Sequence, residues 1–143
     1  MNLDDKIPGC EYFKWREALW LPQWNREANE SDGLNDEILE NIKVTAKWMD
    51  EIRKYFGKPI KIHCWFRPAK YNALVGGGKT SQHLIGKAVD FHVSGMTCDD
   101  VRKALIDANM LEDLGLRMED LPGSNWVHLD DRAPGPSGRF FKP

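Results

Sequence analysis

Cysteine is scarce in this chain, and what there is does not follow a recognisable pairing pattern. Its three cysteines, Cys10, Cys64 and Cys98, lie far apart in the 143 residues. An odd number without Cys-x-x-Cys spacing argues against a disulfide framework and against a zinc site built from thiolates. We therefore expect free thiols, as in a protein made in a reducing cytoplasm.

Long apolar runs and an excess of one charge are also missing. No apolar stretch approaches the roughly 18 residues that a transmembrane helix needs, and the polar, acidic start of the chain lacks the apolar segment of a signal peptide. The net charge is −2, which provides no basic field for nucleic acid or for an anionic membrane. We expect neither of these among its partners.

The length and composition fit one globular domain. A chain of 143 residues is long enough to bury a hydrophobic core without covalent cross-links. There is no internal repeat and no low-complexity segment, so the sequence predicts a single domain over 1–143 and, by default, a monomer.

The first half of the chain contains the clearest helix. Apolar or small residues recur at alternating steps of four and three, which places them on one helix face from about 35 to 56: Ile38, Ile42, Thr45, Met49, Ile52 and Phe56. Gly57 and Pro59 stop that helix. A strand over 60–64 and a short helix over 69–75 follow, the latter ending at a run of three glycines.

The second half mixes strands with a helix. Strict alternation predicts a strand over 88–93, with Asp90 and His92 on its polar face, and Thr97 is a suitable N-cap for a helix that runs to about residue 109. Further strands are predicted over 114–118 and 126–130, and the tail should be irregular, with Phe140 and Phe141 against the body. This order predicts an α+β fold with a small, mainly antiparallel sheet.

Three residues have the types and placement of metal ligands. A turn at Gly86 would fold His83 back beside Asp90, and the strand over 126–130 contributes His128. Two imidazoles and one carboxylate form a typical catalytic zinc set that leaves one position open. Taken alone, a His-x6-Asp spacing is weak evidence, because single His and Asp residues are more often surface or hydrogen-bonded groups.

A longer motif surrounds the first two candidate ligands. The pattern Ser81-x-His83-x-x-Gly86-x-Ala88-x-Asp90 resembles the signature of the zinc D-alanyl-D-alanine carboxypeptidase family. That family includes vancomycin-resistance D,D-dipeptidases and phage L-alanyl-D-glutamate endolysins, with the hedgehog signalling domain as a distant relative.

Other segments extend the resemblance over most of the chain. The late Trp126-Val-His-Leu-Asp130 resembles the family's second signature, and Cys64-Trp-Phe-Arg-Pro68, followed by Asn72 and two glycines, resembles its arginine segment. The opening from Tyr12 to Leu19 is similar to the start of many small members. The likeness thus runs from about residue 12 to residue 141.

The resemblance assigns roles to particular residues. It implies one Zn²⁺ per chain, held by His83, Asp90 and His128, on the sheet of a hedgehog-like fold. Arg67 would face the substrate or the developing oxyanion, and Ser81 would hydrogen-bond to the substrate or to the ligand loop. His92 has no metal role in the motif.

One position departs from the family. Many relatives carry a general base, Glu or Asp, three residues before the last zinc histidine, and here Asn125 occupies that place. Glu119 is our first candidate for the base, because pairing of the last two strands across Pro122-Gly123 would bring it opposite Asn125. Asp120 is the second candidate, and Asp130 should point away along the chain.

The first functional hypothesis is a zinc peptidase that hydrolyses peptidoglycan stem peptides at a D-Ala-D-Ala or an L-Ala-D-Glu bond. Such a domain fits a phage endolysin or another wall-lytic enzyme, which is made in the cytoplasm and acts at the cell wall or in the periplasm. The second hypothesis is a non-catalytic zinc module that recognises wall peptides or a protein partner. A third, a metal-dependent nuclease, is disfavoured by the lack of basic charge.

Overall fold

The longest element of the computed structural model, which describes residues 1–142, is helix α2 (Asp36–Phe56). The Asn35 side chain caps it by accepting a hydrogen bond from the Ile38 N–H at 2.9 Å, and Gly57 ends it with a left-handed φ of 62°. The apolar repeat faces inward, as predicted. The buried residues of α2 are Ile38, Ile42, Thr45, Ala46, Trp48, Met49, Asp50 and Ile52.

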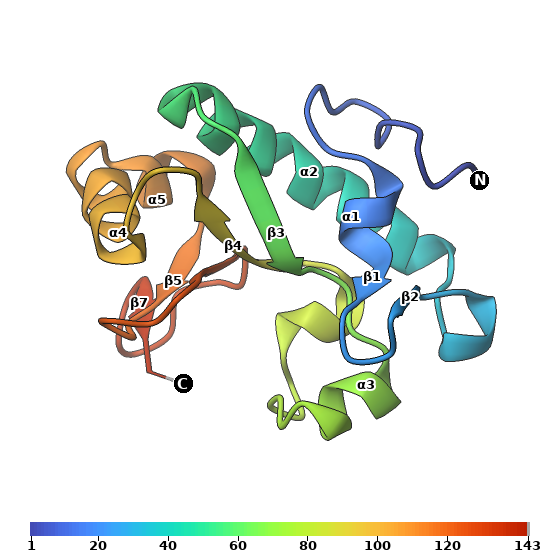
Figure 1. The fold of residues 1–143 in the computed structure, drawn as a ribbon. Helices are drawn as coiled ribbons and strands as arrows, with labels where there is room; N and C mark the ends of the chain where they lie inside the picture. Colours follow the sequence, from blue (N-terminus) through green and yellow to red (C-terminus); the bar gives the residue numbers. More distant parts are fainter. Residues whose placement is uncertain (143) are drawn as a thin grey trace.

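A five-stranded sheet lies at the centre of the molecule (Figure 1). Its strands are β3 (Ile60–Cys64), β4 (Ala88–Val93), β5 (Arg117–Glu119), β6 (Val127–Asp130) and β7 (Phe140–Phe141). They are ordered β3-β4-β6-β5-β7, and every neighbouring pair is antiparallel except β5 and β7. The α+β class with a small, mainly antiparallel sheet is therefore confirmed.

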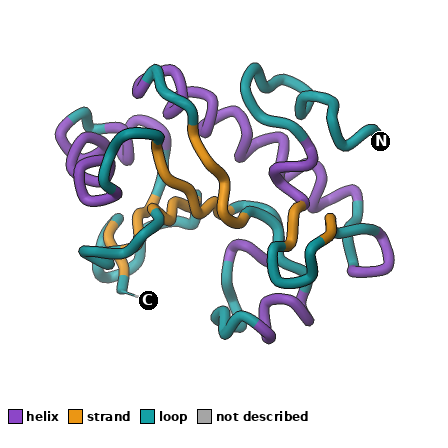
Figure 2. Tube along the Cα trace, viewed as in Figure 1, coloured by secondary structure: helices purple, strands orange, loops and turns teal. Residues whose placement is uncertain are grey.

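Helices lie against one side of this sheet and beyond both of its ends. Figure 1 shows α2 running across one side of the sheet, α4 and α5 at one end, and α3 at the other; Figure 2 shows the strands between these helical parts. The remaining elements are α1 (Trp15–Leu19), β1 (Trp20–Leu21), β2 (Arg26–Glu27), the 3-10 turn η1 (Glu30–Asp32), α3 (Ala69–Leu74), the 3-10 turn η2 (Gln82–Ile85), α4 (Cys98–Asp107) and α5 (Met110–Leu114). Within residues 1–142, no helix is both long enough and apolar enough to cross a membrane.

Several boundaries differ from the sequence prediction: α4 ends at Asp107 and not near residue 109, and the strand expected over 114–118 is β5, Arg117–Glu119. Leu114 is not the start of a strand but the end of α5, which Gly115 closes with a φ of 72°. The five-residue helix buries Leu111 against the core, and so short a segment offers too little periodicity to be recognised. The tail was expected to be irregular, yet Phe140 and Phe141 form β7, paired with Met118 and Glu119.

The register between β5 and β6 shows that the predicted pairing of Glu119 with Asn125 is wrong. Arg117 pairs with Asp130 and Met118 with Leu129, so continuation of the ladder would place Glu119 opposite His128 and not opposite Asn125. The connecting loop is held by α4, a contact that no local pattern reveals.

Two side chains of α4 make that connection. The buried Arg102 donates from Nη2 to the Trp126 carbonyl at 2.6 Å, and the Gly123 N–H donates to the Asp99 carboxylate at 3.1 Å. The loop turns at Pro122 and Gly123, where the Ser124 N–H donates to the Leu121 carbonyl at 3.2 Å. The observed register differs from the predicted one by three residues.

Candidate metal centre

The loop that presents the first ligand is shaped by its two ends. Ser81 caps η2, where its Oγ accepts a hydrogen bond from the His83 N–H at 3.2 Å. Gly86 ends η2 with a φ of 77°, and a Cβ there would come within 2.8 Å of the Ile42 side chain. Only glycine satisfies both conditions, so the predicted turn at Gly86 is confirmed, and it brings His83 beside β4.

Buried partners fix the orientation of this loop. The indole of Trp65 and the hydroxyl of Thr45 both donate to the Gly86 carbonyl at 3.1 Å. The Trp65 carbonyl lies 2.7 Å from Nδ1 of His83. Because a carbonyl can only accept, Nδ1 carries a proton, so Nε2 is the nitrogen that offers a lone pair to a metal once the ring is neutral.

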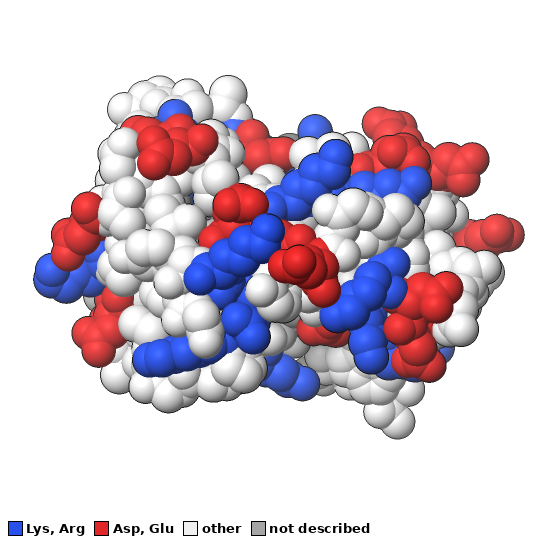
Figure 3. All heavy atoms as spheres, turned by 90° about the horizontal axis from the view of Figure 1, so that it is seen from above, with Lys and Arg blue, Asp and Glu red and all other residues white. Residues whose placement is uncertain are grey.

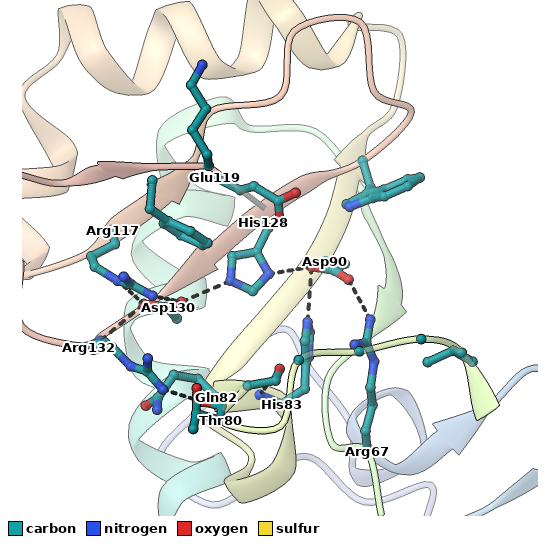
Figure 4. A pocket seen from close by; sticks show the side chains of 18 residues that line it. Arg67, Thr80, Gln82, His83, Asp90, Arg117, Glu119, His128, Asp130 and Arg132 are labelled. Carbon is teal, nitrogen blue, oxygen red and sulfur yellow. Dashed lines mark hydrogen bonds and ion pairs between the residues drawn. The ribbon is translucent and has the colours of Figure 1, made fainter. Parts of the chain in front are cut away.

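Three ligand atoms meet above the sheet (Figure 4). Asp90 and His128 are register partners on β4 and β6. Oδ1 of Asp90 lies 3.2 Å from Nε2 of His83 and 2.8 Å from Nδ1 of His128, and all three atoms lie within 4.8 Å of one another. The three residues predicted as ligands therefore form one cluster.

The cluster fits a tetrahedral metal ion. Nε2 of His83 is buried and, although Oδ1 of Asp90 is 3.2 Å away, it makes no well-aligned hydrogen bond in residues 1–142. A buried polar atom without such a bond is costly unless another group, such as a metal ion, binds it. Bonds of 2.0–2.1 Å in tetrahedral geometry keep ligand atoms about 3.3 Å apart, close to the 3.2 and 2.8 Å that separate Oδ1 of Asp90 from the two imidazole nitrogens. Two imidazole nitrogens and one carboxylate oxygen suit zinc and leave a position for a further ligand.

Strong electrostatic coupling links the three residues. Burial acts to raise the pKa of Asp90, but His83 and His128 outweigh it and hold that pKa well below its usual range. Burial acts to lower the pKa of both histidines, and the carboxylates of Asp90 and Asp130 contribute to raising them instead. A bound cation would take the place of the protons that compensate Asp90.

Asp130 supports the third ligand, contrary to the expectation that it points away. Its Oδ2 lies 2.9 Å from Nε2 of His128, and Arg117 donates to both of its oxygens at 2.9 Å. The Arg117 guanidinium also lies 4.0 Å from the centre of the Phe141 ring. Burial acts to raise the pKa of Asp130, but His128 and Arg117 lower it to about 2. Such a carboxylate orients a metal-binding histidine.

Arg67 lies on the other side of the cluster. Its Nη2 donates to Oδ2 of Asp90 at 3.3 Å, its Nη1 to Asn72 at 3.4 Å and its Nε to the Cys64 sulfur at 3.1 Å. Asn72 in turn donates to the Gly78 carbonyl at 3.0 Å. The guanidinium is thus positioned by β3, by α3 and by the glycine loop.

A single cavity of about 470 Å³ collects most of the predicted site residues. It is lined by Arg67, Ser81, His83, Asp90, Glu119 and His128, together with Arg117, Asp130 and Arg132, which the sequence analysis did not assign to the site. Alternation on the strands could have revealed Arg117 and Asp130, because they share a sheet face with Glu119 and His128.

Three residues considered for the site lie outside this cavity. Asp120 pairs with Lys142 at 2.8 Å, and Asn125 lines a second cavity together with His92. Nδ1 of His92 lies 2.6 Å from Nε2 of His63, so His92 is engaged with a neighbouring histidine on β3.

A small, mainly antiparallel sheet with two histidines and one aspartate converging on its face is an arrangement expected of a metal-dependent hydrolase. The profile of the family described as Peptidase M15 matches residues 21–130. The chain therefore belongs to the M15 peptidases, the zinc D-alanyl-D-alanine carboxypeptidase-like family, as the sequence motifs indicated. None of the curated proteins matches the chain.

Replacing a ligand should remove the metal. We expect His83→Ala, Asp90→Ala and His128→Ala each to weaken zinc binding by more than about 100-fold, because three donors act on one ion. Asp130→Asn should cost about 10–100-fold, the usual effect of losing a partner of a ligand. His92→Ala is the matched control and should keep full occupancy. Metal analysis after dialysis, with circular dichroism to verify folding, tests this, and full occupancy in any two of the ligand variants would contradict the site.

Zinc affinity should rise with pH. The raised pKa of His83, about 10 in the metal-free protein, means that a proton must leave before the metal binds at neutral pH. Apparent affinity should therefore increase by about tenfold per pH unit for each displaced proton. Competition with a chelator between about pH 6 and pH 8 measures this dependence. A flat profile would show that the histidines are already neutral without the metal.

Proposed function

We propose that this chain is a zinc-dependent peptidase that hydrolyses peptidoglycan stem peptides at a D-Ala-D-Ala or an L-Ala-D-Glu bond. A phage-type endolysin or another wall-lytic enzyme would have this activity. The observation that supports it most is the gathering of a three-residue metal centre, an arginine and a free carboxylate around one cavity of an M15 peptidase.

A zinc ion held by His83, Asp90 and His128 would polarise the scissile carbonyl and lower the pKa of a water molecule. The side chains around it then have two tasks in peptide hydrolysis. One must accept a proton from the attacking water, and another must stabilise negative charge on the carbonyl oxygen.

Glu119 is suited to the first task. It lines the cavity, and its carboxylate makes no hydrogen bond or ion pair within residues 1–142. It follows Met118 on β5, whose side chain is buried in the core, so alternation turns Glu119 to the face that carries His128. Although the predicted register is wrong, the corrected register supports the same residue as the general base. Asp120 remains engaged with Lys142.

Arg67 is suited to the second task. A guanidinium offers a rigid set of donors to a carbonyl or carboxylate oxygen. Its contacts with Cys64, Asn72 and Asp90 hold it in place before substrate arrives, and preorganised donors stabilise developing charge most effectively. Ser81 contributes through the ligand loop, which its hydroxyl caps, and its contact with the substrate remains a prediction.

The alternatives are weaker. A non-catalytic zinc module was suggested by the missing acid at Asn125, but Glu119 supplies a carboxylate to the cavity. A nuclease would need a basic surface, and the net charge is −2. On the face shown in Figure 3, acidic and basic side chains are interspersed.

The function is tested by incubating zinc-loaded protein with peptidoglycan fragments and identifying the products by mass spectrometry. New peptide termini would name the bond that is cut. We expect Glu119→Gln to keep zinc and fold but to reduce turnover by roughly 100-fold or more, the scale of a lost general base. Asp120→Asn is the matched control, and it should cost much less.

Several outcomes would contradict this assignment. If Asp120→Asn is inactive while Glu119→Gln is fully active, the two residues exchange roles. If both variants are fully active, the base lies outside this strand. If wild type leaves every stem-peptide fragment intact, the non-catalytic zinc module becomes the better hypothesis.

Removing the arginine should affect catalysis without affecting the metal. Arg67→Ala should keep zinc and fold yet lower kcat/KM by about 100-fold or more, the cost of losing a donor to the oxyanion. Arg67→Lys should recover only part of this, because an ammonium lacks the planar fork. Steady-state kinetics with parallel zinc analysis test this, and wild-type turnover in the alanine variant would exclude a role at the active site.

A further inference from the structure

One basic side chain in the metal cavity has no carboxylate partner in the described part of the chain, unlike the other basic side chains there. The cavity is lined by four of them: Arg67, Arg117, Arg132 and Lys142. Three of them form ion pairs: Arg67 with Asp90, Arg117 with Asp130, and Lys142 with Asp120. Arg132 forms no ion pair with any carboxylate in residues 1–142. The half-buried Arg132 therefore brings an uncompensated positive charge to the site.

Neutral partners hold this guanidinium in place. Its Nη2 donates to the Thr80 carbonyl. With the Gln82 amide oriented so that its oxygen faces the guanidinium, that oxygen accepts from Nε at 3.2 Å and from Nη2 at 2.7 Å. The Arg132 backbone N–H donates to Asp130 at 3.2 Å. The bonds to Thr80 and Gln82 hold the guanidinium without neutralising its charge, and Nη1 donates to no group in residues 1–142.

Arg132 lies close to the candidate metal centre. Thr80 and Gln82 lie in the segment that carries His83, so Arg132 is tied to the ligand loop itself. In Figure 4, Arg132 and Arg67 lie on opposite sides of His83. A peptide whose scissile bond is at the metal could thus meet one guanidinium on each side.

We propose that Arg132 binds a free carboxylate on the substrate residue that follows the scissile bond. This inference rests on the proposed peptidase function and names a chemical requirement for its substrate. Both candidate bonds meet that requirement, because one is followed by a terminal D-alanine and the other by a D-glutamate. A cation whose position is already fixed gains most from a carboxylate, since little entropy is lost on binding.

The test compares pairs of peptides that differ only in that group. One pair is a stem-peptide analogue ending in D-Ala-D-Ala as the free acid and as the C-terminal amide. The other is an L-Ala-D-Glu peptide with its α-carboxylate free or amidated. Wild type should cleave the acid of the susceptible pair about 10–100-fold more efficiently than the amide, the range expected for hydrogen bonds to a charged group. Arg132→Gln should abolish this preference by slowing cleavage of the acid alone.

Two further variants sharpen the comparison. Arg132→Lys should keep part of the preference, because it retains charge without the planar fork. Lys142→Gln is the matched control: it removes a cation of the same cavity that is already paired with Asp120, and it should leave the preference intact. Zinc content should be equal in all variants.

Two results would overturn the inference while leaving the peptidase function in place. One is a wild-type enzyme that cleaves acid and amide equally well. The other is an Arg132→Gln variant that loses activity on both peptides to the same extent, which would indicate a structural role. If neither peptide is cleaved, the proposed function fails, and calorimetry decides the inference: wild type should bind the acids at least about tenfold more tightly than the amides, and Arg132→Gln should not.

Discussion

The carboxylate of Asp90 is the constraint on which the site depends. A buried charge is tolerated only when it is paired and hydrogen-bonded, and here its partners come from three different parts of the chain. His83 arrives on a loop after α3, Arg67 follows β3, and His128 lies on β6. Removing one partner of such a buried arrangement typically costs about 3–5 kcal/mol, so β3, β4, β6 and the ligand loop must all be in place together.

The architecture around Asp90 shows how the fold meets this demand. The Gly86 carbonyl is held by Trp65 and Thr45, which ties the ligand loop to the segment after β3 and to α2. Asp130 and Arg117 form a further layer behind His128. Each candidate ligand is therefore restrained by a group outside the ligand set, an arrangement that would fix both the orientation and the protonation of metal ligands.

Much of the fold and of the metal site was predictable from the sequence because it depends on short-range patterns. The repeat in α2, the alternation in β3 and β4, and the Ser81-to-Asp90 motif each lie within one segment, and the structure confirms them. The register of β5 and β6 was not predictable in this way, because Arg102 and Asp99 of α4 determine the loop between them. The same holds for Arg132 and for β7, whose partners are distant in sequence and carry no periodic signal.

Strand β7 has a consequence for the way the cavity responds to thermal motion. Phe141 lies against His128, with 5.4 Å between ring centres, and beneath the Arg117 guanidinium, yet it belongs to a strand of only two residues. So few backbone hydrogen bonds give the segment a small free energy of local opening, far below that of the sheet interior. Amide hydrogens along this wall should therefore exchange with solvent before those of β4, and local opening there would uncover the cavity without displacing the candidate metal ligands.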